Sequence, residues 1–336
     1  MLEYGVYSLT ERLANPFTKN ILTFKERIDQ LVEYGVYADK KGIHVFGLGE
    51  HHRLDYAVSS PQMVLAAIAA KTSKIKLTAL TSLLNTTDPV RLYEDFATLD
   101  LLSAGRSELT IGRGAFVEAF PLFGYNERDY DELFAEHLQL LNKLNHTSIV
   151  TWKGRHRSSL NNAEIAPRAM QKNIPISIGV GGTLESAERA ANYKCGLTVV
   201  MIGGIVKKYK RLVDTYRKHY EGEHPFVSIA GHTFIRETEE ELEKEFYPYY
   251  ATYWEHLTKQ GIGGAMGVAR SDLEFVTSKE STLIVGTPKQ IIEKIQYQKS
   301  LFQHQRFYAQ VDFGGQSTES VKKTIDLLTE EVMPYV

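Results

Sequence analysis

The sequence predicts an α/β fold, a (β/α)8 barrel with insertions, built as one domain over residues 1–336. Two observations carry this prediction. Short apolar runs typical of buried strands alternate with amphipathic segments along the whole chain. Neither a Pro-, Gly- or Ser-rich linker nor a short repeat divides the sequence. A doubly wound open sheet is the alternative, but eight consecutive units without a linker favour closure.

The first half of the chain contains four predicted strands, each a short apolar run. They lie at residues 2–7, 43–48, 75–81 and 107–111. The first helix is predicted from its apolar face, which carries Ile28, Leu31 and Val32. Ser60-Pro61 and Asp88-Pro89 are helix starts, because each joins a cap residue to a proline in the first turn. The predicted helices cover residues 24–41, 60–71, 88–103 and 130–144.

The second half continues the alternation after a longer connection at 112–128 and a small hairpin at 149–156. The predicted strands lie at residues 176–180, 197–202, 226–235 and 306–311. The predicted helices lie at residues 184–193, 206–220 and 318–332, and a further helix begins over 237–247.

Residues 253–282 break this rhythm, because they contain Gly261-Ile262-Gly263-Gly264 and no clear period. A long irregular insert in a compact domain is usually functional or disordered, so we expect a lid over the site. Substrate specificity is expected from this insert and from the 112–128 connection.

Composition and charge exclude several classes of function. The formal net charge is -2, so the chain lacks the basic field that binding to nucleic acid requires. A single cysteine, Cys195, allows no intrachain disulfide. The N-terminus lacks the layout of a signal peptide, and no apolar run approaches the length needed to cross a membrane. We therefore expect a soluble cytoplasmic protein.

The second predicted strand ends directly at Glu50, His51 and His52. Polar residues at the carboxyl ends of parallel strands point into the ligand-binding crevice. Histidine suits proton transfer, because its pKa lies nearest physiological pH. Neighbouring residues of an extended chain point in opposite directions. One histidine should therefore face the barrel mouth, and the other should pack sideways or meet Glu50. We assign the functional role to His51 and a supporting role to His52.

A metal site is the alternative interpretation of these histidines. It would need further ligands from other strands, for which His232 and Asp312 are candidates. The sequence contains no His-x-His pair or similar signature, so we expect no metal.

The fifth predicted strand ends in a turn that is typical of a phosphate site. Gly181 and Gly182 allow close approach to the backbone, the following helix points its amides at an anion, and Thr183 and Ser186 add hydroxyl donors. Arg113 follows the neighbouring strand between Gly112 and Gly114, and its guanidinium can pair with the same phosphate. A plain turn with a helix cap, and a surface ion pair for Arg113, are the alternatives.

The run from Met63 to Ala70 is apolar all round. A barrel helix needs only one apolar face, so the excess predicts a second buried surface such as a homodimer contact. Coverage by the chain's own insertions is the alternative.

A series of short motifs occurs in order along nearly the whole chain. They are Gly49-Glu50-His51-His52, Thr87-Asp88-Pro89-Val90-Arg91, the Leu-Asp-x-x-Ser-x-Gly-Arg signature at 99–106, Ile111-Gly112-Arg113-Gly114, Pro121-Leu122-Phe123-Gly124, the Gly-Gly-Thr-x-Glu-Ser turn at 181–186, Val285-Gly286-Thr287-Pro288 and Val332-Met333-Pro334. Their order and spacing together resemble the bacterial luciferase-like family of flavin-dependent monooxygenases.

The resemblance implies a TIM barrel that binds reduced FMN. The phosphate would lie against Arg113 and the turn at 181–186, and the isoalloxazine ring would rest near Leu80, Thr81 and Ser82, where relatives often carry a non-prolyl cis peptide. His51 matches a histidine implicated in proton transfer. Relatives are commonly dimers through their second and third helices. The loop after the third strand departs from that of luciferase itself, so light emission is not implied.

The predicted function is that of a two-component monooxygenase, which uses reduced FMN from a separate flavin reductase and O2 to oxidise a small organic substrate. Three alternatives share parts of this pattern. They are a deazaflavin (F420)-dependent hydride transferase on the same scaffold, a metal-dependent barrel hydrolase and a flavin-binding module without turnover.

Overall fold

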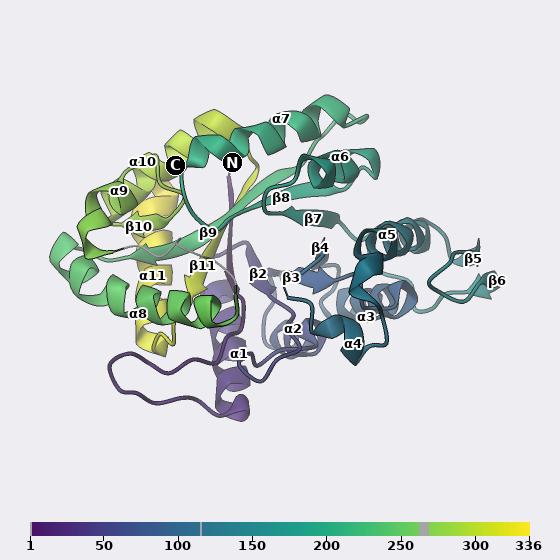
Figure 1. Cartoon of the computed structure of the whole chain (residues 1–336), viewed down its shortest axis with the longest axis horizontal. Helices are drawn as coiled ribbons and strands as arrows, with labels where there is room; N and C mark the ends of the chain where they lie inside the picture. The colour runs from purple at the N-terminus through teal and green to yellow at the C-terminus, as the bar shows by residue number, and fades with distance from the viewer. Residues whose placement is uncertain (1, 115, 262–268) are drawn as a thin grey trace.

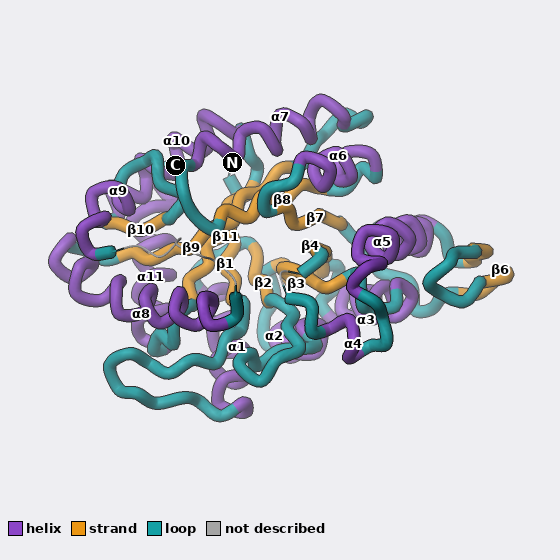
Figure 2. The backbone as a smooth tube through the Cα atoms, in the orientation of Figure 1, coloured by secondary structure: helices purple, strands orange, loops and turns teal. Residues whose placement is uncertain are grey.

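The computed structural model describes residues 2–114, 116–261 and 269–336. Eight parallel strands close into a barrel with helices around it, as predicted (Figures 1 and 2). In order around the barrel they are β1 (Glu3–Ser8), β2 (Val45–Leu48), β3 (Lys76–Leu83), β4 (Ser107–Gly112), β7 (Ile176–Val180), β8 (Gly196–Met201), β9 (Val227–Ile235) and β11 (Arg306–Asp312). β11 pairs with β1, which closes the ring.

The outer layer consists of the helices that connect the strands. The longer ones are α1 (Phe24–Lys40), α2 (Pro61–Ala69), α3 (Pro89–Leu102), α5 (Tyr130–His146), α6 (Leu184–Asn192), α7 (Lys210–His219), α8 (Glu239–Lys259), α10 (Pro288–Phe302) and α11 (Thr318–Leu327). The predicted start of α3 is confirmed, because the Asp88 side chain accepts hydrogen bonds from the amides of Val90 and Arg91. Within the described ranges, none of the helices has both the length and the apolar character to cross a bilayer.

Three departures from the predicted elements concern short or irregular segments. The hairpin is longer than expected, since β5 (Ile149–Trp152) pairs with β6 (Leu160–Glu164) and projects from one side of the barrel in Figure 1. The 112–128 connection contains a short helix, α4 (Ala119–Leu122). A further strand, β10 (Ile284–Gly286), pairs with the end of β9 outside the barrel ring.

The segment predicted as an irregular insert is partly helical. α8 continues to Lys259, so residues 253–259 belong to a regular helix, and α9 (Leu273–Thr277) lies near the other end of the segment. Residues 262–268, the middle of the predicted lid, lie outside the described residues. The aromatic side chains of α8, including Phe246, Tyr250 and Trp254, form a second hydrophobic core against Phe313.

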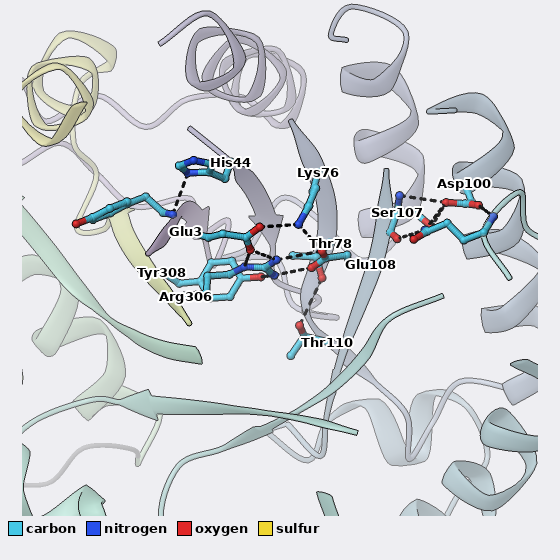
Figure 3. A network of polar contacts seen from close by, with 12 residues as sticks. Glu3, His44, Lys76, Thr78, Asp100, Ser107, Glu108, Thr110, Arg306 and Tyr308 are labelled. Atoms are coloured by element: carbon cyan, nitrogen blue, oxygen red, sulfur yellow. Dashed lines mark hydrogen bonds and ion pairs between the residues drawn. The ribbon is translucent and has the colours of Figure 1, made fainter. Parts of the chain in front are cut away.

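Charged residues close the N-terminal end of the barrel, opposite the site (Figure 3). Arg306 of β11 donates to Glu3 of β1 at 2.5 Å and to Glu108 of β4 at 2.5 Å, while Lys76 of β3 donates to Glu3 at 2.7 Å. Arg306 also donates to the Tyr308 hydroxyl at 2.7 Å. Two cations and two carboxylates from four strands therefore lie against one another. Their pairing offsets the free-energy cost of removing these charges from water.

Candidate functional site

A cavity of about 370 Å³ opens at the carboxyl ends of the barrel strands. Most of the predicted site residues line it together: Glu50, His51, Leu80, Thr81, Gly112, Arg113, Gly181, Gly182, Thr183 and Ser186. Two predicted residues lie beside the cavity and are absent from its lining, namely His52 and the buried Ser82. The site residues therefore form a continuous arc along the carboxyl ends of four neighbouring strands, β2, β3, β4 and β7, as the strand order predicts.

Glu50 joins two parts of the cavity wall. One carboxylate oxygen lies 3.0 Å from Nε2 of His52, and the other accepts a hydrogen bond from the Leu83 amide at 3.2 Å. His52 packs edge-on against Phe123, with ring centroids 4.8 Å apart. The prediction that one histidine meets Glu50 while the other faces the barrel mouth is confirmed.

His51 lies in an aromatic sandwich at the cavity wall. Its ring stacks on Tyr56, with centroids 3.9 Å apart and planes 16° apart, and meets Phe116 edge-on at 5.6 Å. Burial, together with the neighbouring His52, lowers the pKa of His51 to about 3. The ring is therefore uncharged at neutral pH. Its Nδ1 atom is buried and has no hydrogen-bond partner among the described residues.

The opposite end of the cavity gathers hydrogen-bond donors. Arg113 reaches from the end of β4 to Ser186 Oγ at 3.2 Å and to Thr183 Oγ1 at 3.5 Å. The Thr183 hydroxyl donates to Ser186 Oγ at 2.7 Å, and Thr183 makes no side-chain cap to α6. The first-turn amides of α6 thus lack a side-chain acceptor, and helix N-termini of this kind favour anions.

Two contacts hold the Arg113 guanidinium in place. Asp131 accepts from Nη1 at 2.6 Å, and the Tyr130 ring lies beneath the group at 5.0 Å. Asp131 is largely exposed, so this ion pair is weak, while Nη2 is directed at the hydroxyl groups of Thr183 and Ser186. The surface ion pair, which was the alternative prediction for Arg113, is therefore present. Arg113 also contacts Thr183 and Ser186, as the phosphate-site prediction requires.

The floor between the two ends is built by β3 and two glycines. The Leu80–Thr81 peptide bond is cis, which confirms the non-prolyl cis peptide expected at this place. A side chain at Gly112 or Gly179 would collide with the Thr81 side chain, so only glycine fits against it. At Gly181 and Gly182 an added Cβ would meet no atom within 4 Å, so the backbone there is open to the cavity.

The aromatic wall of the cavity is the part that sequence reasoning missed. Tyr7, Tyr56, Phe116, Tyr253 and Trp254 line it, and they come from β1, two loops and α8. They are scattered over 248 positions of the chain, so no local motif joins them. The aromatic run on α8 was a signal, but core packing explains such a run equally well before the fold is known.

The candidate metal ligands serve other contacts. His232 Nδ1 lies 3.2 Å from the Tyr250 hydroxyl, and Asp312 accepts from Arg27 at 2.5 Å. Within residues 2–114, 116–261 and 269–336, no group of three His, Cys, Asp or Glu side chains is arranged to hold a metal ion.

Solved structures share this fold over nearly the whole chain. A monooxygenase from Streptomyces bottropensis, RslO1, superimposes with a TM-score of 0.84 at 21% identity and covers 99% of both chains. The oxygenating constituent of 3,6-diketocamphane monooxygenase from Pseudomonas putida, solved with FMN, gives 0.79 at 18% identity over 100% of this chain and 99% of the other. An F420-dependent secondary alcohol dehydrogenase gives 0.72 at 14% identity over 98% of both.

Proteins that are similar in sequence also match this chain over most of its length. The oxygenase component of a flavin-dependent trigonelline monooxygenase from Acinetobacter baylyi is 22% identical over 99% of this chain and 95% of its own. An N-acetyl-S-alkylcysteine monooxygenase from Bacillus subtilis is 26% identical over 81% and 83%. A family model described as luciferase-like monooxygenase matches residues 2–304. The chain therefore belongs to the luciferase-like monooxygenase family.

Proposed function

We propose that the protein is the oxygenase component of a two-component system, which uses reduced FMN and O2 to oxidise a small organic substrate. The observation that carries the proposal is the polar end of the cavity, where Arg113, Thr183, Ser186 and the start of α6 converge. The relative from Acinetobacter baylyi is named as an oxygenase component, which supports a separate flavin reductase as partner.

The residues present fit FMN at both ends of the cavity. A phosphate needs cationic and amide donors, which Arg113 and the α6 start supply. A flat ring needs a floor without protruding side chains, and the Thr81 floor with Gly112 and Gly179 provides one. The volume of about 370 Å³ lies within the range of cofactor sites.

The protein's own contribution is to bind, orient and exclude water, while bound reduced FMN would supply the two electrons for oxygenation. Arg113 would hold the phosphate, and Glu50 fixes the wall by joining His52 to the Leu83 amide. His51 is uncharged, so its ring would act toward the bound molecules as a neutral hydrogen-bonding group rather than as an imidazolium ion. The aromatic wall would keep water from the reacting atoms.

Titration of the protein with oxidised and reduced FMN, alongside F420 and zinc, tests the proposal. We expect FMN to bind at micromolar or lower concentration, and reduced FMN with substrate to consume O2. Binding of F420 in preference to FMN would favour the hydride transferase. Bound zinc without flavin affinity would favour the hydrolase, and FMN binding without substrate-dependent O2 use would favour the binding module.

Arg113→Ala is a sharper test of the phosphate end. The variant should bind FMN roughly tenfold to a hundredfold more weakly, because it loses one or two charge-assisted hydrogen bonds to the phosphate. Its affinity for riboflavin should remain almost unchanged. Both affinities are measured by quenching of flavin fluorescence. Arg155→Ala is the matched control, since Arg155 pairs with an exposed carboxylate at 2.8 Å outside the cavity. Equal losses for FMN and riboflavin would contradict the assignment.

We also propose that the chain forms a homodimer through α2 and α3. Met63, Ala67 and Ala70 are exposed along one face of α2, and Leu101 and Leu102 are exposed at the end of α3. The two helices pack against each other and are joined by a hydrogen bond from Gln62 to Asp95 at 3.1 Å. The apolar face of α2 that the sequence predicts is therefore only partly covered by this chain.

A further inference from the structure

The two ends of the main cavity differ in charge. Among the described residues, Arg113 is the only lysine or arginine in the cavity lining. It stands at the end of β4 beside the turn at 181–186, where the proposed FMN phosphate would neutralise it. Residues 115 and 262–268, outside the described ranges, are alanine and the run Ile-Gly-Gly-Ala-Met-Gly-Val, so they contribute no charged side chain. Bound FMN would therefore leave the cavity without a free cation of its own lining.

The aromatic wall lies on the other side of the barrel from this cation. β1 and β11 face β7 and β4 across the ring of strands, and α8 follows β9, the neighbour of β11. The rings of the wall are close to one another. The Tyr56 centroid lies 5.8 Å from that of Phe116 and 5.7 Å from that of His256 on α8, and those of Tyr253 and Trp254 are 5.8 Å apart. A molecule at this end of the cavity would be surrounded mainly by aromatic side chains.

The imidazole and phenol groups at the aromatic end are uncharged at neutral pH. Burial lowers the pKa of His51 to about 3 and that of His232 to about 4. His232 packs edge-on against Tyr253, with ring centroids 5.0 Å apart. Burial also raises the pKa of the Tyr7 and Tyr56 phenols, so both keep their protons. None of these five groups can pair with a negative charge as a cation.

One arginine stands behind the aromatic wall. The Arg53 guanidinium lies 4.9 Å from the centre of the Phe116 ring, and Arg53 is absent from the cavity lining. Asp55 accepts two hydrogen bonds from it, at 3.0 Å and 3.1 Å, and Gln260 accepts a further one. Glu118, which does line the cavity, lies 3.9 Å from Arg53. An anion at this end would therefore meet a carboxylate of the lining, while the guanidinium is already paired with Asp55.

We propose that the substrate is a small, uncharged ring compound that packs against the aromatic wall, and that the cavity excludes organic acids. A carboxylate buried without a cationic partner is costly, whereas a ring gains from stacked and edge-on contacts beyond the area that it buries. The substrate has to be small, because the cavity of about 370 Å³ would also hold the flavin ring. This inference names the substrate class of the proposed function and rests on that function.

Four small probes test the substrate class: methyl benzoate, benzoate, phenyltrimethylammonium and the open-chain ester methyl heptanoate. Each is titrated into the wild type by calorimetry with excess oxidised FMN, so that the phosphate occupies Arg113. Methyl benzoate should bind most tightly. Methyl heptanoate, which has the same number of carbon atoms, should bind roughly twofold to tenfold more weakly, and benzoate about a hundredfold or more. Equal or tighter binding of any other probe, or competition between methyl benzoate and FMN, would overturn the inference.

Leu257→Lys places a cation at the aromatic end. Leu257 lines the cavity on the same helix as Trp254 and is 6% exposed. The variant should bind benzoate roughly tenfold or more tightly than the wild type does, because an ammonium group can then pair with the carboxylate. Leu257→Met, of similar volume and without charge, is the matched control and should keep the wild-type order of the four probes. A lysine variant that binds FMN but gains no affinity for benzoate would contradict the assigned charge of this end.

FMN binding separates failure of this inference from failure of the proposed function. A wild type that does not bind FMN would overturn the proposed function. The four probes are then titrated into flavin-free Arg113→Ala, whose described cavity lining contains no lysine or arginine. The same order of affinities there would support the ligand chemistry assigned to the aromatic end, and equal or tighter binding of benzoate would overturn it.

Discussion

Burial decides which histidines of this barrel can carry a charge. The pKa of His51 is lowered to about 3 and those of His232 and His304 to about 4, with burial as the main cause in each case. His51 faces a cavity and His232 has a tyrosine partner, whereas both ring nitrogens of His304 are buried without a partner among the described residues. An uncharged histidine in the site has to act through hydrogen bonds, which limits the chemistry that can be assigned to His51.

His304→Phe should raise the free energy of unfolding by about 1–2 kcal/mol at pH 7, because it removes two buried polar atoms without partners. The gain should grow as the pH falls from 6.5 toward 4. In that window the unfolded chain protonates His304 and the folded chain does not, so the histidine destabilises the fold increasingly.

Urea denaturation at pH 7 and pH 5 measures this difference. His224→Phe is the matched control, because that side chain is 92% exposed. A loss of stability in His304→Phe, or a gain that is the same at both pH values, would show that the ring nitrogens are satisfied in the folded protein.

At the scale of the element, one buried lysine ties the end of the predicted insert to the barrel. Lys294 of α10 donates from Nζ to the carbonyls of Val276 at 2.7 Å, Ser278 at 2.5 Å and Leu283 at 2.9 Å. It thereby joins α9, the turn after it and the residue before β10. Burial lowers its pKa to about 7.

Lys294→Met should cost about 1–3 kcal/mol of stability, since it leaves three buried carbonyl groups unpaired. The loss should be larger at pH 9 than at pH 7. Between these values the unfolded lysine stays protonated and the folded one is neutral, so the wild type gains stability with rising pH and the variant does not. Hydrogen exchange should accelerate at residues 276–283, and Lys289→Met, at an exposed position of the same helix, should change neither quantity.

The elements that the sequence predicted correctly share strong local signals. The strands are continuous apolar runs, and Asp88-Pro89 fixes the start of α3. The sequence predicts α8 only to residue 247, because Pro248 interrupts the helical pattern and the many aromatic side chains of the helix hide its period. The sequence pattern does not predict the helix α10, although Thr287-Pro288 carries the same kind of start signal as Asp88-Pro89. Its apolar face is narrow, and the buried Lys294 and Gln298 lie on it.

At the scale of the whole molecule, closure of the barrel turns separate motifs into one site. The sequence predicts one site for Glu50, Arg113 and the turn at 181–186, because the carboxyl ends of parallel strands meet at one face of a barrel. The aromatic wall could not be predicted in this way. It depends on loops and on α8, whose positions are set by tertiary packing rather than by local sequence.

The apolar residues that the barrel leaves exposed on α2 predict an association of two chains. Met63 is 70% exposed, and Ala67 and Ala70 follow it on the same face. Small residues at such a surface let two helices approach closely, so a long charged side chain at its centre should prevent the contact. We expect the wild type to sediment as a dimer at micromolar concentration.

Ala67→Arg should shift the protein to the monomer in sedimentation velocity experiments, with at least a tenfold weaker association, because each chain would place a guanidinium in an apolar contact. Ala251→Arg is the matched control, since Ala251 is an exposed alanine on α8, the helix that follows β9, and β11 and β1 separate β9 from β2 in the barrel. FMN binding should persist in both variants, because the cavity is lined by one chain. A wild type that is monomeric at these concentrations, or an Ala67→Arg variant that remains dimeric, would contradict the α2 interface.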